Sequence, residues 1–559
     1  MATSTATPIA RSKVQPPDPD AEIDPRRRRL ILVAMCTALV AVVASVSGLN
    51  VAQGQLAVDL GATQSQLLWV INGYTIALAA LLLPIGAIGD RWGRKHVLVA
   101  GLGLFIATNV AASMASTVTQ LMVFRVLGGV AAAMIMPITL SVITSTFPGE
   151  ERDRAVGVWA GFAGAGGVLG LITSSFVVDN ATWPWVFAGP IIAAAIALAM
   201  TLLVVPHSKE AHEGRYDVVG AVLSAVTVGG LVLAVHEGPE VGWSHPLTVL
   251  GLTAGILGAA WFAWWELRND HPLLDLRVFR HRSLAVGSVV LLAVFALMMG
   301  LFLVLVQYLQ AVLGWSAIKA SMGLMPMAAV LLPLSAAAPL IARRVGLRGM
   351  FVGGMGLVAL GAGMMATMAS VDGGYFSVLP GLLVLAVGAG LAQTPATSAI
   401  TGSLPVEEQG VASALNDTVR EFGGALGIAL IGSALSAGYR TGLANSTDAL
   451  PPQAASVVRE GIGGAAAVAS KAGPRGEQIM SVARSAFVDG FSQALWLGVG
   501  LAVAAAVFAL IWLPRRADAT DEVIDQDGSI VDASPFDQSA VELALLRVDV
   551  GLLVPEPAA

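Results

Sequence analysis

The chain has 559 residues, of which 56% are hydrophobic and 12% charged, and its mean hydropathy is +0.77. One water-soluble core cannot bury this much apolar surface, and many apolar runs are long enough to cross a bilayer. The formal net charge of -6 is spread over tails and loops, so it indicates no nucleic-acid partner. The single cysteine, Cys36, excludes an intramolecular disulfide. We therefore expect an all-α polytopic membrane protein.

Taken in chain order, the sequence begins with a polar tail, residues 1–29, that lacks the apolar core of a signal peptide and is expected to be disordered and cytoplasmic. Arg26 to Arg29 precede the first apolar run and should hold that end inside the cell. We expect fourteen membrane spans, at residues 30–49, 67–89, 97–115, 120–146, 155–178, 185–205, 218–235, 246–265, 284–306, 317–342, 350–369, 377–400, 419–437 and 487–513. Most Lys and Arg residues fall in the segments that this topology places in the cytoplasm. The acidic C-terminal tail, 514–559, is also expected in the cytoplasm.

A weak internal repeat divides the chain. Residues 339–348 resemble residues 86–95, so that Gly346 aligns with Gly93 and Arg348 with Lys95, as expected for parallel repeated halves. The repeat predicts an N-terminal six-helix half at 30–206, a linker with two extra transmembrane helices at 207–283, and a C-terminal six-helix half at 284–513. The long outer loop 438–486 either contains an amphipathic interfacial helix in its middle or is disordered.

A short basic loop, Gly86 to His96, lies between two long apolar runs. Asp90 ends the first run, where a carboxylate can reach a neighbouring helix terminus. Arg91, Arg94 and Lys95 are expected in water beside anionic headgroups. The loop resembles the first signature of the major facilitator superfamily of secondary transporters, where it joins the second and third membrane helices. An ordinary positive cytoplasmic loop is the alternative interpretation.

The fourth expected span contains Arg125, whose unpaired guanidinium would cost about 3 kcal/mol in a membrane, so it should face the protein interior. The pattern from Leu121 to Gly129 resembles the superfamily's second signature, whose arginine is associated with proton transfer. An arginine that reaches to an aqueous boundary is the alternative.

The fifth span has glycines one helical turn apart, including Gly161, Gly166 and Gly170. They resemble the hinge of the antiporter signature of drug-exporting facilitators, although the prolines usual in that signature are absent. Simple close helix packing is the alternative.

Residues 50–52 and 59–69 resemble the fourteen-span drug:proton antiporter family. Members usually carry aspartates where this chain has Ser45 and Asn72, and neither of these side chains can exchange a proton. The remaining acids of most interest are Asp417 and Glu421. They flank Arg420, in a run that resembles the family's thirteenth span, where Arg420 could support gating or coupling. A helix-end cap between Arg420 and Glu421 is the alternative.

A substrate site in this fold is expected near the membrane midplane, between the halves. Its candidates are the polar and aromatic residues within the spans, together with an apolar wall: Asn72, Tyr74, Gln307, Tyr308, Gln310 and Gln393, with Phe295 and Met298. For any single Phe or Met, the alternative is an apolar side chain that faces lipid and has no role in substrate binding. The sequence has no nucleotide-binding loop, metal-ligand spacing or catalytic cluster, so we expect neither an enzyme nor a bound cofactor.

The resemblance implies a transporter of the plasma membrane with both termini in the cytoplasm. It would act as a monomer and export amphipathic drugs or other small molecules by alternating access, with the proton gradient as its energy source. An envelope-lipid transporter or an uncoupled facilitator is one alternative. A membrane sensor or scaffold that does not transport is another.

Overall fold

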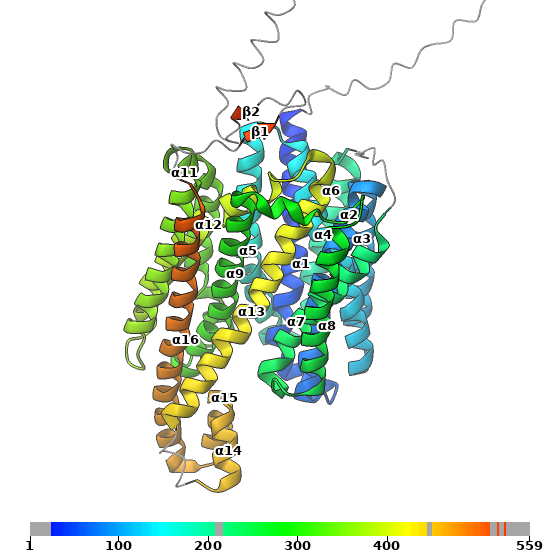
Figure 1. The fold of residues 1–559 in the computed structure, drawn as a ribbon. Helices are drawn as coiled ribbons and strands as arrows, with labels where there is room; N and C mark the ends of the chain where they lie inside the picture. Colours follow the sequence, from blue (N-terminus) through cyan, green and yellow to red (C-terminus); the bar gives the residue numbers. More distant parts are fainter. Residues whose placement is uncertain (1–23, 207–215, 444–449, 515–521, 525–529, 533–559) are drawn as a thin grey trace, which may run out of the picture.

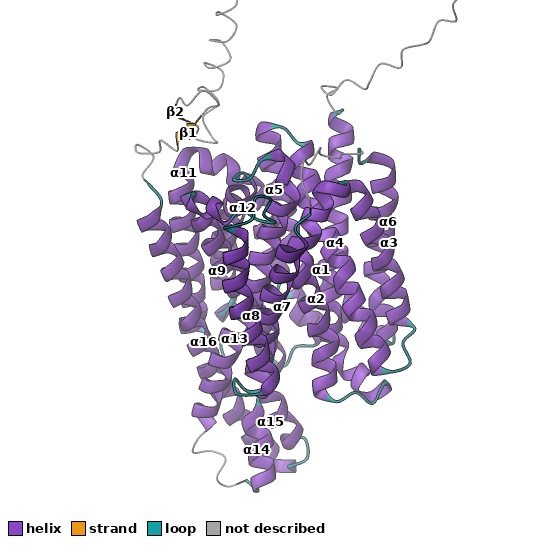
Figure 2. Cartoon of the chain, turned by 45° about the vertical axis from the view of Figure 1, so that its right-hand side comes forward, coloured by secondary structure: helices purple, strands orange, loops and turns teal. Residues whose placement is uncertain are grey.

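The computed structural model describes residues 24–206, 216–443, 450–514, 522–524 and 530–532. Helices dominate this part of the chain (Figure 2). Residues 1–23 of the expected tail 1–29, the start of the linker at 207–215 and most of the C-terminal tail lie outside the described residues. The expectation of disorder up to residue 29 is wrong, because a helix begins at Pro25. The carboxylate of Asp24 caps this helix by accepting a hydrogen bond from the backbone N–H of Arg26 at 3.0 Å.

The described residues form sixteen α-helices, which run largely along one direction as a bundle (Figure 1). In chain order they are α1 (Pro25–Asp59), α2 (Gln64–Trp92), α3 (Arg94–Ser113), α4 (Val118–Thr146), α5 (Gly149–Asn180), α6 (Ala188–Val204), α7 (Val218–Val241), α8 (Pro246–Glu266), α9 (Arg282–Gln307), α10 (Ala317–Met322), α11 (Met325–Met368), α12 (Leu379–Thr401), α13 (Gln409–Leu443), α14 (Pro452–Glu460), α15 (Ile462–Ala469) and α16 (Gly476–Trp512). Two short strands, β1 (Glu522–Ile524) and β2 (Ile530–Asp532), pair antiparallel with Val523 opposite Val531.

Thirteen helical stretches of the described chain are long and apolar enough to cross a membrane. One of them, Ala317–Met368, is 52 residues long and includes α11. The backbone of α11 is not helical at Gly346, which has φ 79° and joins two helices across a kink. The two sides of this kink correspond to the tenth and eleventh expected spans, which accounts for the difference between thirteen stretches and fourteen spans.

The helices pack in two groups with a pair beside them. In the first group, α1 packs on α4, α5 and α6, and α2 packs on α4. In the second, α9 packs on α12, α13 and α16, and α11 packs on α12 and α16. The groups meet where α2 and α4 contact α13 and where α5 contacts α11 and α12, while α7 lies against α2 and α13 with α8 behind it. The exact limits of the two halves stay a prediction.

The repeated loops occupy equivalent places. Gly93 and Gly346 both have positive φ, 98° and 79°, a backbone conformation that favours glycine. Lys95 donates hydrogen bonds from Nζ to Leu202 O at 3.0 Å and Val205 O at 2.7 Å, at the end of α6. Arg348 donates one to Leu510 O, near the end of α16. The alignment of Lys95 with Arg348 is thus confirmed in the structure.

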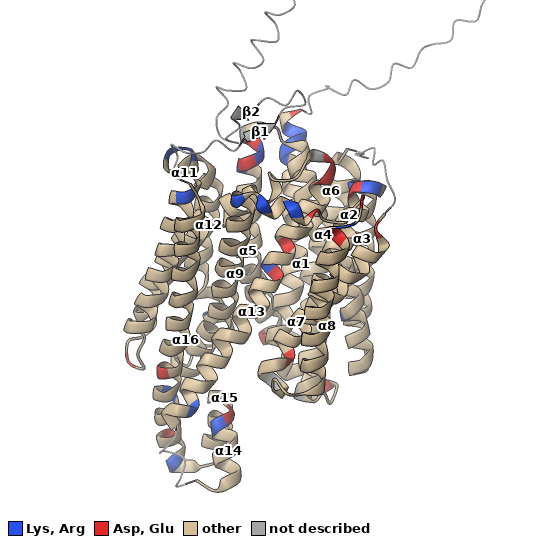
Figure 3. Cartoon of the chain, viewed as in Figure 1, with Lys and Arg blue, Asp and Glu red and all other residues tan. Residues whose placement is uncertain are grey.

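Figure 3 shows Lys and Arg gathered at the end of the bundle that carries the start of α1, and charges of both signs at the far ends of α13 to α16. We call the end that carries the start of α1 and the α2–α3 and α4–α5 connections the basic end, and the opposite one the distal end. At the distal end, α13 and α16 extend beyond the other helices and are joined through α14 and α15 (Figure 1). The expected outer loop 438–486 is therefore wrong in extent, because α13 continues to Leu443 and α16 begins at Gly476. Apolarity defined the expected spans, whereas a helix continues into water where Ala and charged residues support it.

Candidate functional site

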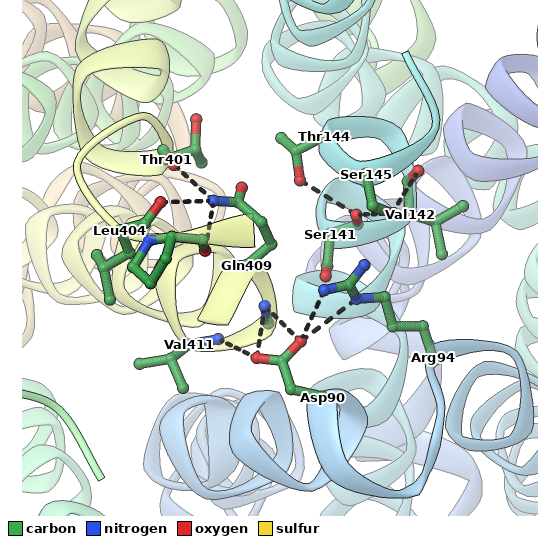
Figure 4. Close-up of polar contacts among 12 residues, drawn as sticks. Asp90, Arg94, Ser141, Val142, Thr144, Ser145, Thr401, Leu404, Gln409 and Val411 are labelled. Atoms are coloured by element: carbon green, nitrogen blue, oxygen red, sulfur yellow. Dashed lines mark hydrogen bonds and ion pairs between the residues drawn. The ribbon is translucent and has the colours of Figure 1, made fainter. Parts of the chain in front are cut away.

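Asp90 joins the two groups of helices at the basic end (Figure 4). Its carboxylate accepts hydrogen bonds from the backbone N–H of Gly410, at 2.9 and 2.8 Å, and of Val411, at 3.2 Å. Arg94 donates to the same carboxylate from Nε at 3.3 Å and from a terminal nitrogen at 3.2 Å. Asp90 therefore caps the first turn of α13 from α2, which confirms the prediction that it reaches a neighbouring helix terminus.

The local sequence explains why Asp90 turns away from its own helix. It lies in the last turn of α2, where the helix dipole disfavours a negative charge, whereas the start of α13 favours one. Gly93 ends α2 and begins α3 with positive φ, and across this turn Arg94, four residues after Asp90, pairs with its carboxylate.

A second contact strengthens this junction. On α5, Arg152 donates to Gln409 Oε1 at 3.1 Å and to Thr401 O at 3.4 Å. The backbones of α2 and α13 also approach closely, because a Cβ added at Gly410 would lie 2.4 Å from the carbonyl oxygen of Gly86. We call Asp90, Arg94, Arg152, Gln409 and Gly410 the basic-end clamp.

The expectation that Arg94 and Lys95 stay in water is wrong. Only 1% of Arg94 and 9% of Lys95 is exposed. The Asp90 carboxylate compensates the charge of Arg94, and the carbonyls at the end of α6 compensate that of Lys95. Arg91 is half-buried, with its guanidinium 5.8 Å from the ring centroid of Tyr216.

Within the first group of helices, Arg125 is 2% exposed and lies in a polar cluster. It donates from Nε to Val70 O at 3.3 Å and from Nη1 to Ser45 Oγ at 3.0 Å. Ser45 in turn donates to Asn109 Oδ1 at 3.2 Å. The guanidinium carbon is 4.1 Å from the ring centroid of Tyr74, a cation–π contact. The prediction that Arg125 faces the protein interior is confirmed.

The second group contributes a cluster on α13. Arg420 pairs with Asp417 at 3.1 Å, and Asn416 Nδ2 donates to Asp417 at 3.2 Å. The Arg420 guanidinium also stacks on the rings of Trp159, at 4.9 Å, and Phe295, at 4.5 Å. The alternative of a helix-end cap is wrong, because α13 begins at Gln409, far from Arg420, and the partner is Asp417.

Glu421 differs from these paired charges. It is half-buried, and it makes no hydrogen bond or ion pair within the part of the chain that the structure describes. It lies close enough to Tyr74 of α2 for the two groups to interact electrostatically. The clusters around Arg125 and on α13 therefore approach each other where the two groups of helices meet.

The other expected substrate residues fall in two places. Gln393 donates to Ala160 O at 2.9 Å and joins α12 to α5, and Met298 is fully buried. Asn72 is half-buried near Tyr74 on α2.

By contrast, Tyr308 lies inside the second group of helices, towards the distal end. Its hydroxyl donates to Ser370 O at 2.8 Å, and its ring stacks on Phe491 with centroids 5.2 Å apart. Gln307 is half-buried and Gln310 is exposed. The structure does not bring these three residues to Tyr74.

The glycines of α5 serve two separate interfaces. A Cβ at Gly161 would lie 3.1 Å from Leu332 of α11, across the junction of the groups. One at Gly170 would lie 2.6 Å from the Cα of Ala44 on α1, and Gly166 faces Val43 of the same helix. Close helix packing thus explains these glycines, and a hinge role stays a prediction.

Sequence reasoning missed Arg152, Gln409, Trp159 and Asn109 as members of the site. Arg152 lies in a charged run at the start of α5, a signal that it could anchor this helix, but its partner Gln409 is 257 residues away. No local spacing could have paired them.

The fold and these charged clusters within the spans define a membrane transport protein. The Major Facilitator Superfamily matches residues 33–428, and the chain belongs to this family. The chain is 29% identical to the tetracenomycin C resistance and export protein of Streptomyces glaucescens, over 89% of this chain and 93% of that protein. It is 31% identical to the multidrug efflux pump LfrA of Mycolicibacterium smegmatis, over 81% and 89%.

Solved structures share the fold at lower sequence identity. The proton:xylose symporter XylE superposes with a TM-score of 0.57 at 15% identity, over 88% of this chain and 97% of that one. A bacterial homologue of the human lysosomal transporter Spinster gives a TM-score of 0.55 at 17% identity, over the same shares.

Proposed function

We propose that this protein is a secondary active transporter that exports amphipathic small molecules across the plasma membrane in exchange for protons. The observation that carries the proposal is the meeting of two charged clusters within the membrane spans, Arg125 with Tyr74 on one side and Asp417, Arg420 and Glu421 on the other. Charges at this depth are costly, so they indicate a pathway for substrate or ions.

The position of the basic-end clamp supports a mechanism of alternating access. By the positive-inside rule the basic end faces the cytoplasm, together with both termini. The clamp then closes the cytoplasmic side, and substrate enters from the cell only after Asp90 releases the start of α13. Hydrogen bonds that form in only one state bias the equilibrium between the two facing states.

Proton exchange is assigned to Glu421. Ser45 and Asn72 cannot titrate, and Asp417 is held in an ion pair by Arg420. Glu421 has no such pair within the described residues and is partly accessible. A carboxyl group that gains a proton in one facing state and loses it in the other couples the two fluxes.

The relatives support a small-molecule substrate. LfrA is named as a multidrug efflux pump, and the Streptomyces protein as a resistance and export protein. Phe295 and Met298 offer an apolar wall beside the α13 cluster, which suits amphipathic molecules. We assign no bound cofactor, and the working unit is the monomer.

Export can be tested in bacterial cells that lack their own efflux pumps. Cells that produce the protein should accumulate less of a lipophilic cationic dye than cells that produce the Glu421→Gln variant at the same level. A protonophore should remove the difference, because it collapses the proton gradient. Equal accumulation in these two strains would contradict the assignment of proton exchange to Glu421, and equal accumulation in cells with and without the wild-type protein would contradict export. A difference that survives the protonophore would indicate an uncoupled facilitator.

A further inference from the structure

Arg125 differs from the other buried arginines of the described chain in having no acidic partner. Arg28, Arg94 and Arg420 pair with Glu151, Asp90 and Asp417, respectively. The contacts of Arg125 are to a backbone carbonyl, a hydroxyl and an aromatic ring, all neutral. The charge of this buried guanidinium is therefore only partly compensated.

The geometry also leaves hydrogen-bond donors unused. Arg125 Nη2 is buried and has no hydrogen-bond partner within the described residues. Nη1 gives one bond to Ser45 Oγ and keeps a second N–H. These two nitrogens form the end of the guanidinium fork that binds a carboxylate with two parallel hydrogen bonds.

The surroundings fix the arginine for this role. Nε is held by Val70 O, the Tyr74 ring covers one face at 4.1 Å, and Asn109 orients Ser45. The Tyr74 hydroxyl is itself anchored to Val42 O at 3.4 Å. A guanidinium held on several sides loses little conformational freedom when it binds a ligand.

Building on the transport function proposed above, we propose that Arg125 is the subsite for an acidic group of the substrate. Among amphipathic substrates, those that carry a carboxylate would then bind more tightly than cations of similar shape. A zwitterion fits especially well, because its positive group can approach Glu421, which is half-buried and close to Tyr74. Arg125 is 2% exposed in this conformation, so the acid reaches it when the two groups of helices separate.

A matched pair of dyes tests the subsite. Tetramethylrhodamine as its free acid is a zwitterion, whereas its ethyl ester is a cation of nearly the same shape. Binding to the purified full-length protein is measured by fluorescence anisotropy, and the readout is the ratio of the two dissociation constants. We expect the free acid to bind at least about tenfold more tightly than the ester, which corresponds to one bidentate charge-assisted contact.

Ser45 supplies the decisive variants. In Ser45→Asp an internal carboxylate would occupy the guanidinium, so the preference for the free acid should disappear. Ser45→Asn introduces a side chain of the size of aspartate without its charge. The ratio of the dissociation constant of the ester to that of the free acid should be at least about tenfold smaller in Ser45→Asp than in Ser45→Asn. A thermal unfolding curve of each variant shows whether it is folded.

The possible results distinguish a failure of the proposed subsite from a failure of the proposed transport function. Tighter binding of the ester by the wild-type protein, no binding of the free acid, or an unchanged preference in folded Ser45→Asp would each overturn the subsite. Binding of the acid with the expected preference, but no movement of either dye across liposomes, would overturn the transport function and leave the subsite standing.

Discussion

The Glu421→Gln variant should bind substrate and lose proton exchange. Glutamine keeps the size and polarity of the side chain but cannot change its charge between the two facing states, so substrate movement no longer carries a proton. In liposomes with an internal pH dye, substrate-dependent proton flux should fall about tenfold or more. Direct binding of a substrate whose positive group approaches Glu421 should also weaken, but by less than the proton flux falls.

Glu237→Gln is the matched control for this experiment. Glu237 is a buried carboxylate near the distal end of α7, away from the cluster on α13. The groups that face Glu421 are Tyr74 of α2 and, on its own helix, Asp417 and Arg420. If Glu421→Gln retains normal proton flux, the proton site lies elsewhere, and Asp417 becomes the remaining candidate in this cluster.

The Asp90→Ala variant should open the basic end and stop export. It removes the acceptor for two backbone N–H groups of α13 and for Arg94. Hydrogen bonds to a charged group contribute about 1.5–3 kcal/mol each, so the clamped state should become at least about tenfold less populated relative to the open one.

A single reporter cysteine measures this change. Cys36 is the only cysteine, and Cys36→Ala gives a background into which Ser413→Cys is introduced on the first turns of α13. Ser413 is fully buried, and its hydroxyl has no partner within the described residues, so cysteine fits in its place. Asp90→Ala should raise the rate of thiol labelling about tenfold or more.

The control for the clamp is Asp270→Ala. Asp270 is an exposed carboxylate on the connection that follows α8, at the same end of the bundle. The substitution should leave both labelling and export as they are. Labelling that is equally slow in Asp90→Ala would show that the Asp90 contacts do not hold the basic end closed.

Much of the fold followed from apolarity and charge alone. The fourteen expected spans correspond to long helices once the kink at Gly346 is taken into account. The lengths of α13 and α16 could not be predicted in this way, because their distal ends are Ala-rich and charged rather than apolar. Apolarity reports where a helix lies in the membrane, not where the helix ends.

Within the site, the pairing of Asp417 with Arg420 was not predicted, and the pairing considered from the sequence was that of Arg420 with its direct neighbour Glu421. Residues three apart face each other on a helix and direct neighbours do not, so this spacing was a local signal for the observed pair. The Asp90 signature indicated a helix terminus as partner. Which terminus could not be read from the sequence, since Gly410 is 320 residues away.

The main error was the expectation that the basic loop lies in water, because the structure buries it. Three positive charges in a short loop are typical of an aqueous surface, and the sequence showed no partner for Lys95. The partners are carbonyl oxygens at the end of α6, which every helix terminus exposes. Such backbone partners leave no signature in the side chains, so only the structure identifies them.

Substrate and protons are expected to move in opposite directions through this protein. The most direct test uses the purified wild-type protein in liposomes that contain an internal pH dye and are held at an imposed proton gradient. Addition of an amphipathic substrate should accelerate the proton flux, and a proton gradient should drive the substrate against its own gradient. Substrate movement with no change in the pH signal would contradict the account.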